Sequence, residues 1–152
     1  MLKDLISPNS SSIMKVQTRV PGTVLTRAEL DVIKADLAAI NVDLIENSTS
    51  IKFTAQATGN HQIHLAPNPT WYEYLHEYYH LQHLKGVNYS AFVRTSKTLK
   101  EQYVYDQLRL DLAWKTKMSQ IERDHAFNYI NRCPNGNPLS TPSRSFPAPD
   151  IP

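Results

Sequence analysis

Residues 61–86 read HQIHLAPNPTWYEYLHEYYHLQHLKG, and the hydrophobic period changes within this stretch from that of a strand to that of a helix. Over residues 61–66, Ile63 and Leu65 alternate with polar side chains, so both should lie on one face of a β-strand. The residues after Pro69 fit a long helix. A strand that leads directly into a long helix therefore forms the centre of the predicted fold.

The start of this helix has two candidate signals. Asn68 can precede a helix in which Pro69 takes the first helical position. Thr70 and Glu73 instead have the spacing of a capping box, in which each side chain accepts a hydrogen bond from the other residue's backbone. At the other end, Gly86 is expected to stop the helix.

The rest of the chain predicts more helices and two more strands. We expect an amphipathic helix over 27–40, strands at 42–46 and 50–55, helical structure from about 90 to 117 with a break near Thr95–Ser96, and a last helix over 119–133. This order predicts an α+β fold, with a small antiparallel sheet of about three strands packed on four or so helices.

The 152 residues suit one domain with termini of a different composition. Residues 1–22 are expected to form a flexible lead-in and residues 23–133 the folded domain. Residues 134–152, which hold six of the ten prolines, are expected to form a proline-rich tail. Cys133 is the single cysteine, so no intramolecular disulfide can form.

The charge balance excludes some classes of partner. The chain carries 16 basic and 14 acidic side chains, a net charge of +2, and no basic cluster with interleaved aromatic residues. We therefore expect no nucleic-acid partner. No apolar run is long enough to cross a bilayer, and the first residues lack the apolar segment of a signal peptide. We expect no membrane insertion and no signal peptide of the chain's own.

The predicted central helix contains the pattern H-E-x-x-H, formed by His76, Glu77 and His80. Residues four apart lie one turn apart on one helix face, so the two imidazoles can converge on one metal ion. Glu77 points beside that ion, where a base for a metal-activated water belongs. The alternative is a pair of histidines in the core or on an exposed polar face, with no metal.

A catalytic zinc usually has three protein ligands, and Glu101 is the preferred third candidate. It opens an apolar stripe of Val104, Tyr105, Leu108 and Leu112 at helical spacing, so its carboxylate should face the core and need a partner. The alternative is a salt bridge or exposure at a helix start.

Two other candidates on the central helix are weaker. His83 lies roughly 10 Å along the helix from His76, too far for both to bind one ion. Glu73 is better explained as the capping-box glutamate.

The last predicted helix carries His125 among apolar residues. It could donate a hydrogen bond to the oxyanion of a tetrahedral intermediate, and so could Tyr103 or Tyr105. A lone histidine of this kind is more often structural. His125 is therefore a candidate catalytic residue with a purely structural alternative.

The segments LTRAELDVIKADLAAINVDLI, IHLAPNPTWYEYLHEYYHLQHLKG, LKEQYVYDQL and HAFNYIN resemble the zincin-like metallopeptidase toxin domains of bacterial polymorphic toxins. The resemblance covers roughly residues 22–132. It implies a gluzincin-type zinc peptidase with His76, His80 and Glu101 as ligands and Glu77 as the base. The lead-in and the proline-rich tail do not match this pattern.

The resemblance also implies a biological setting. Such domains sit at the C-termini of large secreted proteins of the contact-dependent inhibition or Rhs type. They are delivered into the cytoplasm of a rival cell, cleave a protein or peptide there, and are neutralised by a cognate immunity protein.

Two other functions stay open: an intracellular regulatory metalloprotease, and a non-catalytic binding module with a structural zinc. If the domain is a peptidase, we expect its substrate to extend an edge strand, with residues 61–65 as the first choice.

Overall fold

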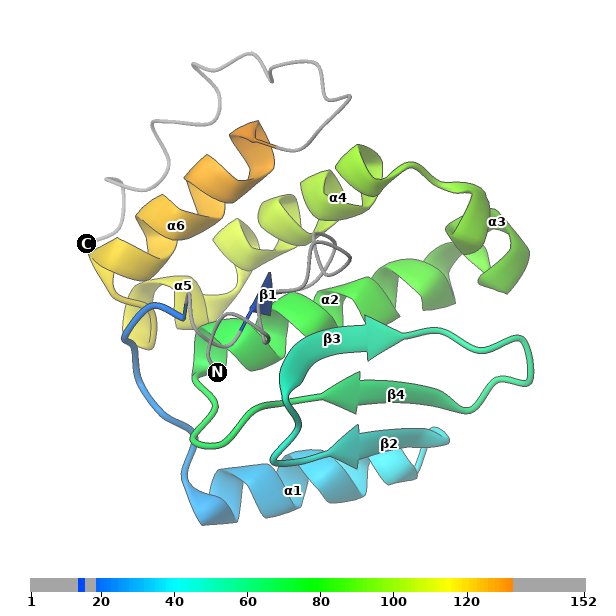
Figure 1. The fold of residues 1–152 in the computed structure, drawn as a ribbon, viewed down its shortest axis with the longest axis horizontal. Coiled ribbons are helices and arrows are strands. Elements are labelled where there is room, and N and C mark those ends of the chain that lie inside the picture. Colours follow the sequence, from blue (N-terminus) through cyan, green and yellow to red (C-terminus); the bar gives the residue numbers. More distant parts are fainter. Residues whose placement is uncertain (1–13, 16–18, 133–152) are drawn as a thin grey trace.

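The computed structural model describes residues 14–15 and 19–132, which form an α+β fold (Figure 1). The strands are β1 (Met14–Lys15), β2 (Val42–Ile45), β3 (Ser50–Thr54) and β4 (His61–His64). The helices are α1 (Arg27–Ala38), α2 (Trp71–Val87), α3 (Tyr89–Arg94), α4 (Lys97–Leu110), α5 (Leu112–Thr116) and α6 (Gln120–Asn131). The expected α+β class is confirmed.

The sheet is mixed, with strand order β1-β3-β4-β2. β3 pairs antiparallel with β4 and with β1, whereas β2 pairs parallel with β4, with Val42 opposite His61. The prediction of a purely antiparallel sheet was therefore wrong. Alternating side chains indicate which face of a strand is buried, and they carry no information about the direction of the neighbouring strand.

The position of β4 corrects a second expectation. β4 lies between β3 and β2, so both of its edges are already paired. The chosen substrate strand, 61–65, therefore has no free edge. Among the described residues, β1 pairs with β3 at Ser50 and Ile51.

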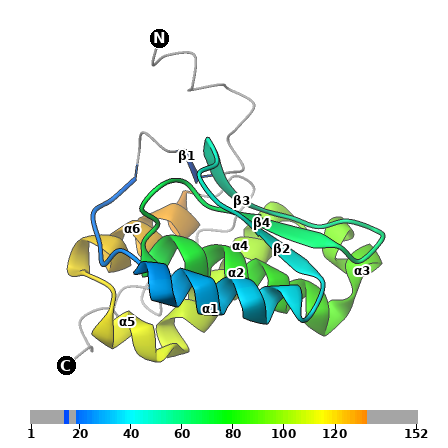
Figure 2. The ribbon, with the colours of Figure 1, turned by 90° about the horizontal axis from the view of Figure 1, so that it is seen from below.

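Helix α2 lies between the sheet and α4, while α1 packs along β2 and α6 packs on α4 (Figures 1 and 2). Side chains from all these layers form one hydrophobic core. Its fully buried members include Val42, Ile51, Ile63, Tyr72, Leu81 and Leu108. α2 thus has neighbours on two sides, which explains why its histidines and glutamates face protein rather than solvent.

Helix α2 begins with the capping box of Thr70 and Glu73, one of the two predicted helix starts. The Thr70 hydroxyl accepts from the Glu73 backbone at 3.1 Å, and a Glu73 carboxylate oxygen accepts from the Thr70 backbone at 3.0 Å. Asn68 has a positive φ of 52°, so Pro69 does not begin the helix. The alternative start at Asn68 was therefore wrong.

The side chain of Arg19 anchors the chain before α1 onto α2. Its Nε and Nη2 donate to the two carboxylate oxygens of Glu73 at 2.7 and 2.8 Å. Arg19 falls within the residues that composition predicts as a flexible lead-in, yet here it is bound to a fully buried carboxylate. Most of the lead-in and the tail at 134–152 lie outside the described residues.

The helical region after α2 is divided more than the sequence predicts. The break near Thr95–Ser96 is present, with Ser96 as the N-cap of α4. A second break follows at Asp111, which caps the short helix α5. The chain turns there, so Leu112 is 73% exposed and does not continue the predicted core stripe. The described part of the chain holds six helices where four or so were expected, and none of them is long and apolar enough to span a membrane.

A substitution at Gly86 tests where α2 ends. The helix continues through Gly86 to Val87, contrary to the expected stop, and a Cβ at Gly86 would meet no atom within 4 Å. We expect Gly86→Ala to raise the free energy of unfolding by about 0.5 to 1 kcal/mol, because glycine is a poor helix former. Urea unfolding followed by circular dichroism measures this difference.

Gly59 is the matched control for this substitution. It also has open space around it, but its φ is +95°, where alanine is strained. Gly59→Ala should therefore lower the free energy of unfolding. A loss of stability in Gly86→Ala would mean that the helix stops before Gly86 after all.

Candidate metal centre

Helix α2 presents His76 and His80 one turn apart toward α4. Their rings are 5.1 Å apart between centroids, and the two residues are only 6% and 8% exposed. Buried imidazole nitrogens need a hydrogen-bond partner or a metal ion. The two imidazoles therefore lie close together, as their i, i+4 spacing in the sequence predicts.

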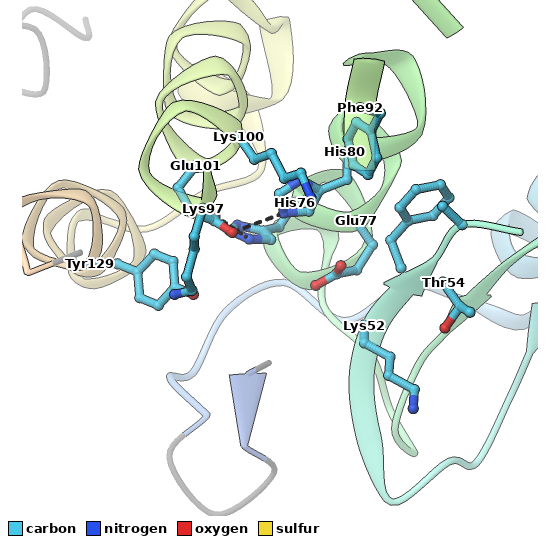
Figure 3. Close-up of a pocket in the computed structure, with 12 residues that line it drawn as sticks. Lys52, Thr54, His76, Glu77, His80, Phe92, Lys97, Lys100, Glu101 and Tyr129 are labelled. Carbon is cyan, nitrogen blue, oxygen red and sulfur yellow. Dashed lines mark hydrogen bonds and ion pairs between the residues drawn. The ribbon is translucent and has the colours of Figure 1, made fainter. Parts of the chain in front are cut away.

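Helix α4 supplies an acidic partner. The Nε2 atoms of His76 and His80 lie 3.1 Å from Oε1 and Oε2 of Glu101, respectively. The three side chains are buried, and one potential ligand atom from each lies within 4.8 Å of the others. Figure 3 shows the Glu101 carboxylate facing the two rings across the space between α4 and α2. The structure thus brings together the three residues predicted as ligands.

The geometry of this group fits a zinc ion. Tetrahedral zinc with bonds of about 2.0 to 2.1 Å places its ligand atoms about 3.4 Å apart. Here one ligand atom from each residue lies within 4.8 Å of the others, so modest side-chain adjustment would bring them to that spacing. Oε1 of Glu101 is buried and has no hydrogen-bond partner, although His76 Nε2 is near. Two imidazoles and one carboxylate are also a donor set that zinc accepts in catalytic sites.

The three side chains shift one another's proton affinities. Burial alone would raise the pKa of Glu101, but the neighbouring imidazoles outweigh it and hold that pKa well below its usual range. Burial would lower the pKa of His76, and the Glu101 carboxylate outweighs it and raises that pKa. The carboxylate is therefore ionised at neutral pH, as a metal ligand must be.

Glu77 lies beside the triad and lines the same cavity. It is 3% exposed, and Figure 3 shows its carboxylate pointing into the space between α2 and β3. Burial raises the pKa of Glu77, while His76 and His80 counteract part of that shift. A raised pKa brings a carboxyl group closer to the range in which it can both accept and return a proton.

A cavity of about 520 Å³ opens over these residues. It is bounded on one side by residues 52–55, at the end of β3, and on the other by α4. Its wall includes Tyr129 from α6, whose ring lies 5.8 Å from that of His76. An open space beside three candidate ligands is the arrangement of catalytic rather than closed structural zinc sites.

The other residues considered from the sequence do not line this cavity. His83 stacks on Tyr103 with the ring centroids 4.4 Å apart, away from the triad. Tyr105 is buried in the core. His125 Nδ1 lies 2.8 Å from the Tyr72 hydroxyl and outside the cavity wall. The structure therefore places His125, the candidate catalytic histidine, behind the site rather than in it.

Several cavity residues were missed from the sequence, among them Lys52, Lys97, Lys100 and Tyr129. Lys97 precedes Glu101 by one helical turn, so it shares that helix face, and this spacing was a usable signal. Tyr129 likewise follows His125 by one turn, but only the packing of α6 on α4 brings it to the cavity. The Nζ of Lys97 donates to the Tyr129 hydroxyl at 3.2 Å.

Comparison with known proteins gives one match. A family model described as metallopeptidase toxin 4 matches residues 11–136. This chain belongs to that family. The match confirms the resemblance to metallopeptidase toxin domains of polymorphic toxins, and the family name implies both a metal and a peptidase activity. No curated protein and no solved structure matches the chain.

The metallopeptidase toxin 4 match also narrows the choice between the functions left open by the sequence. A peptidase toxin is consistent with a protein substrate and with delivery as part of a larger toxin. The matched range includes His76, Glu77, His80 and Glu101, the residues gathered at the cavity.

Proposed function

We propose that this chain is a zinc-dependent endopeptidase with a zincin-like, gluzincin-type site, acting as an antibacterial toxin domain. The observation that carries the proposal is the convergence of His76, His80 and Glu101 beside the buried Glu77, at an open cavity. A zinc ion held by the three ligands would supply Lewis acidity and lower the pKa of water.

Glu77 then acts as the general base. Its carboxylate takes a proton from the water that attacks the peptide carbonyl, and it returns the proton to the leaving amine. Glu77 lines the cavity in which the peptide would bind, so its carboxylate can face the reacting groups. Tyr129, whose hydroxyl oxygen is held by Lys97, is the cavity residue suited to donate to the developing oxyanion.

The substrate peptide would lie extended along β3 at Lys52–Thr54. This segment lines the cavity. Pairing there replaces the earlier choice of residues 61–65, which are interior to the sheet. Strand addition would present a peptide bond to Glu77 without requiring a particular sequence.

Family membership supports a proposal for the biological setting. We propose that the domain is delivered into the cytoplasm of a target bacterium as part of a larger toxin, and that a cognate immunity protein neutralises it. A regulatory protease would have the same site and differ in its setting. A purely structural zinc does not account for a base as buried as Glu77 next to an open cavity.

Reversible metal dependence tests the proposal. The zinc-loaded protein should cleave unfolded casein, stop when a chelator is added in excess, and recover when zinc is restored. Fragments are followed by mass spectrometry. Cleavage that continues undiminished in the chelator would show that the activity does not use this metal centre.

A further inference from the structure

Three lysines line the cavity beside the candidate metal centre. Lys97 and Lys100 come from α4, on the helix face that also carries Glu101. Lys52 comes from β3, on the opposite wall. Figure 3 shows Glu77 between the Lys97 side and the Lys52 side of the cavity. A peptide bound over Glu77 would therefore pass between cationic groups on two walls.

The two lysines of α4 are held in place by aromatic neighbours. Lys97 Nζ donates to the Tyr129 hydroxyl and lies 5.1 Å from the centre of that ring. Lys100 Nζ lies 4.3 Å from the centre of the Phe92 ring. Such contacts restrict the long side chains before any ligand arrives, which lowers the entropy cost of binding.

These cations have no carboxylate partner of their own. Across the described residues, no Asp or Glu oxygen lies within 4.0 Å of Lys52, Lys97 or Lys100. Among the described residues that line the cavity, the acidic side chains are Glu77 and Glu101. A divalent ion would offset those two charges, so the three lysines leave the loaded cavity strongly positive.

We infer that the substrate carries Asp or Glu side chains beside the scissile bond, bound by Lys52 on one wall and Lys97 on the other. This inference rests on the proposed function and names its substrate class. Cations in a concave, half-buried position attract anions more strongly than the same charges on an open surface. The cavity volume of about 520 Å³ suits a few peptide residues rather than a nucleic-acid duplex.

A binding experiment tests the inference without requiring turnover. Two fluorescent decapeptide pools would differ only at their four central positions, which hold Asp and Glu in one pool and Asn and Gln in the other. With the zinc-loaded Glu77→Gln protein, we expect the acidic pool to bind at least tenfold more tightly by fluorescence anisotropy. Equal affinity for the two pools would overturn the inference.

Substitutions assign the preference to particular side chains. Lys52→Gln and Lys97→Gln should each weaken binding of the acidic pool about fivefold and leave the neutral pool unchanged. Lys97→Arg should restore most of the loss, because the charge returns. Lys115→Gln removes an exposed lysine of α5 outside the cavity wall and should have no effect. If Lys115→Gln weakens binding as much as the other two, overall charge rather than the cavity explains the preference.

Cleavage assays on the wild type distinguish a failure of the inferred substrate class from a failure of the proposed peptidase function. Wild-type protein that cleaves acidic and neutral pools equally well would overturn the substrate class and keep the peptidase. An acidic preference in binding with no cleavage by the wild type would support the cavity and overturn the peptidase. Displacement of the acidic pool by short single-stranded DNA that binds more tightly would overturn the choice of a peptide ligand.

Discussion

Replacing Glu77 with glutamine is expected to abolish peptide cleavage and to leave the metal bound. Glutamine keeps the size of the side chain but cannot accept a proton, and a positioned general base contributes roughly 10²- to 10⁴-fold to a rate. Glu77 is not one of the three side chains that form the candidate ligand group. The measurements are the rate of casein cleavage and the zinc content per chain, made on the same preparation.

Loss of folding is a poor alternative explanation for such a result. Burial raises the pKa of Glu77, so its ionised form is disfavoured in the folded protein relative to the unfolded one. The raised pKa therefore costs stability at every pH above the ordinary pKa of a glutamate, neutral pH included, and a neutral amide removes that cost. The variant should therefore be at least as resistant to urea as the wild type.

Asp43→Asn provides the control. Asp43 is exposed on β2 and lies outside the cavity wall, so its substitution should leave the cleavage rate unchanged. Cleavage by Glu77→Gln at the wild-type rate would mean that another group takes the proton, and the proposed mechanism would then be wrong.

The sequence predicted those features of the site that depend on the local geometry of one helix. The spacing of His76 and His80 fixes their relation on any helix, whatever the rest of the fold. Glu101 could be added because Val104, Tyr105 and Leu108 mark the buried face of its helix, and all three are buried. A carboxylate on that face needed a partner, and the histidines are the partners that the structure brings to it.

The sequence did not predict contacts between elements that are far apart along the chain. The parallel pairing of β2 with β4 depends on where the chain crosses the sheet, and strand periodicity is the same for either neighbour. Leu112 continues the apolar spacing of α4, but the Asp111 cap redirects the chain and leaves this leucine exposed. Tyr129 reaches the cavity only because α6 packs on α4, a tertiary contact without a local signature.

Replacing His80 with alanine is expected to remove the metal. Wild-type protein purified without chelator should carry close to one zinc per chain, and the variant close to none. Loss of an outer partner of a ligand alone costs about 10- to 100-fold in affinity, so loss of a ligand should cost more. Zinc per chain is measured by elemental analysis, with affinity determined by competition against a chelator.

His83→Ala is the matched control, since it removes another histidine from the same helix. His83 stacks on Tyr103 and does not belong to the candidate ligand group. Its replacement should therefore leave the zinc content unchanged. Equal zinc loss in both variants would indicate binding that depends on histidine content rather than on the triad.

Metal removal should lower stability without unfolding the chain. Zinc at 100 times its dissociation constant stabilises a native state by about 2.7 kcal/mol, and a chelator would remove that contribution. In the absence of metal, Glu101 remains next to His76 and His80 at 3.1 Å, so its buried charge still has partners. The core under α2 also contains no part of the ligand group.

We expect the protein in excess chelator to melt at a lower temperature but to have the same circular dichroism spectrum before melting. An unchanged melting temperature would show that the native fold does not bind zinc.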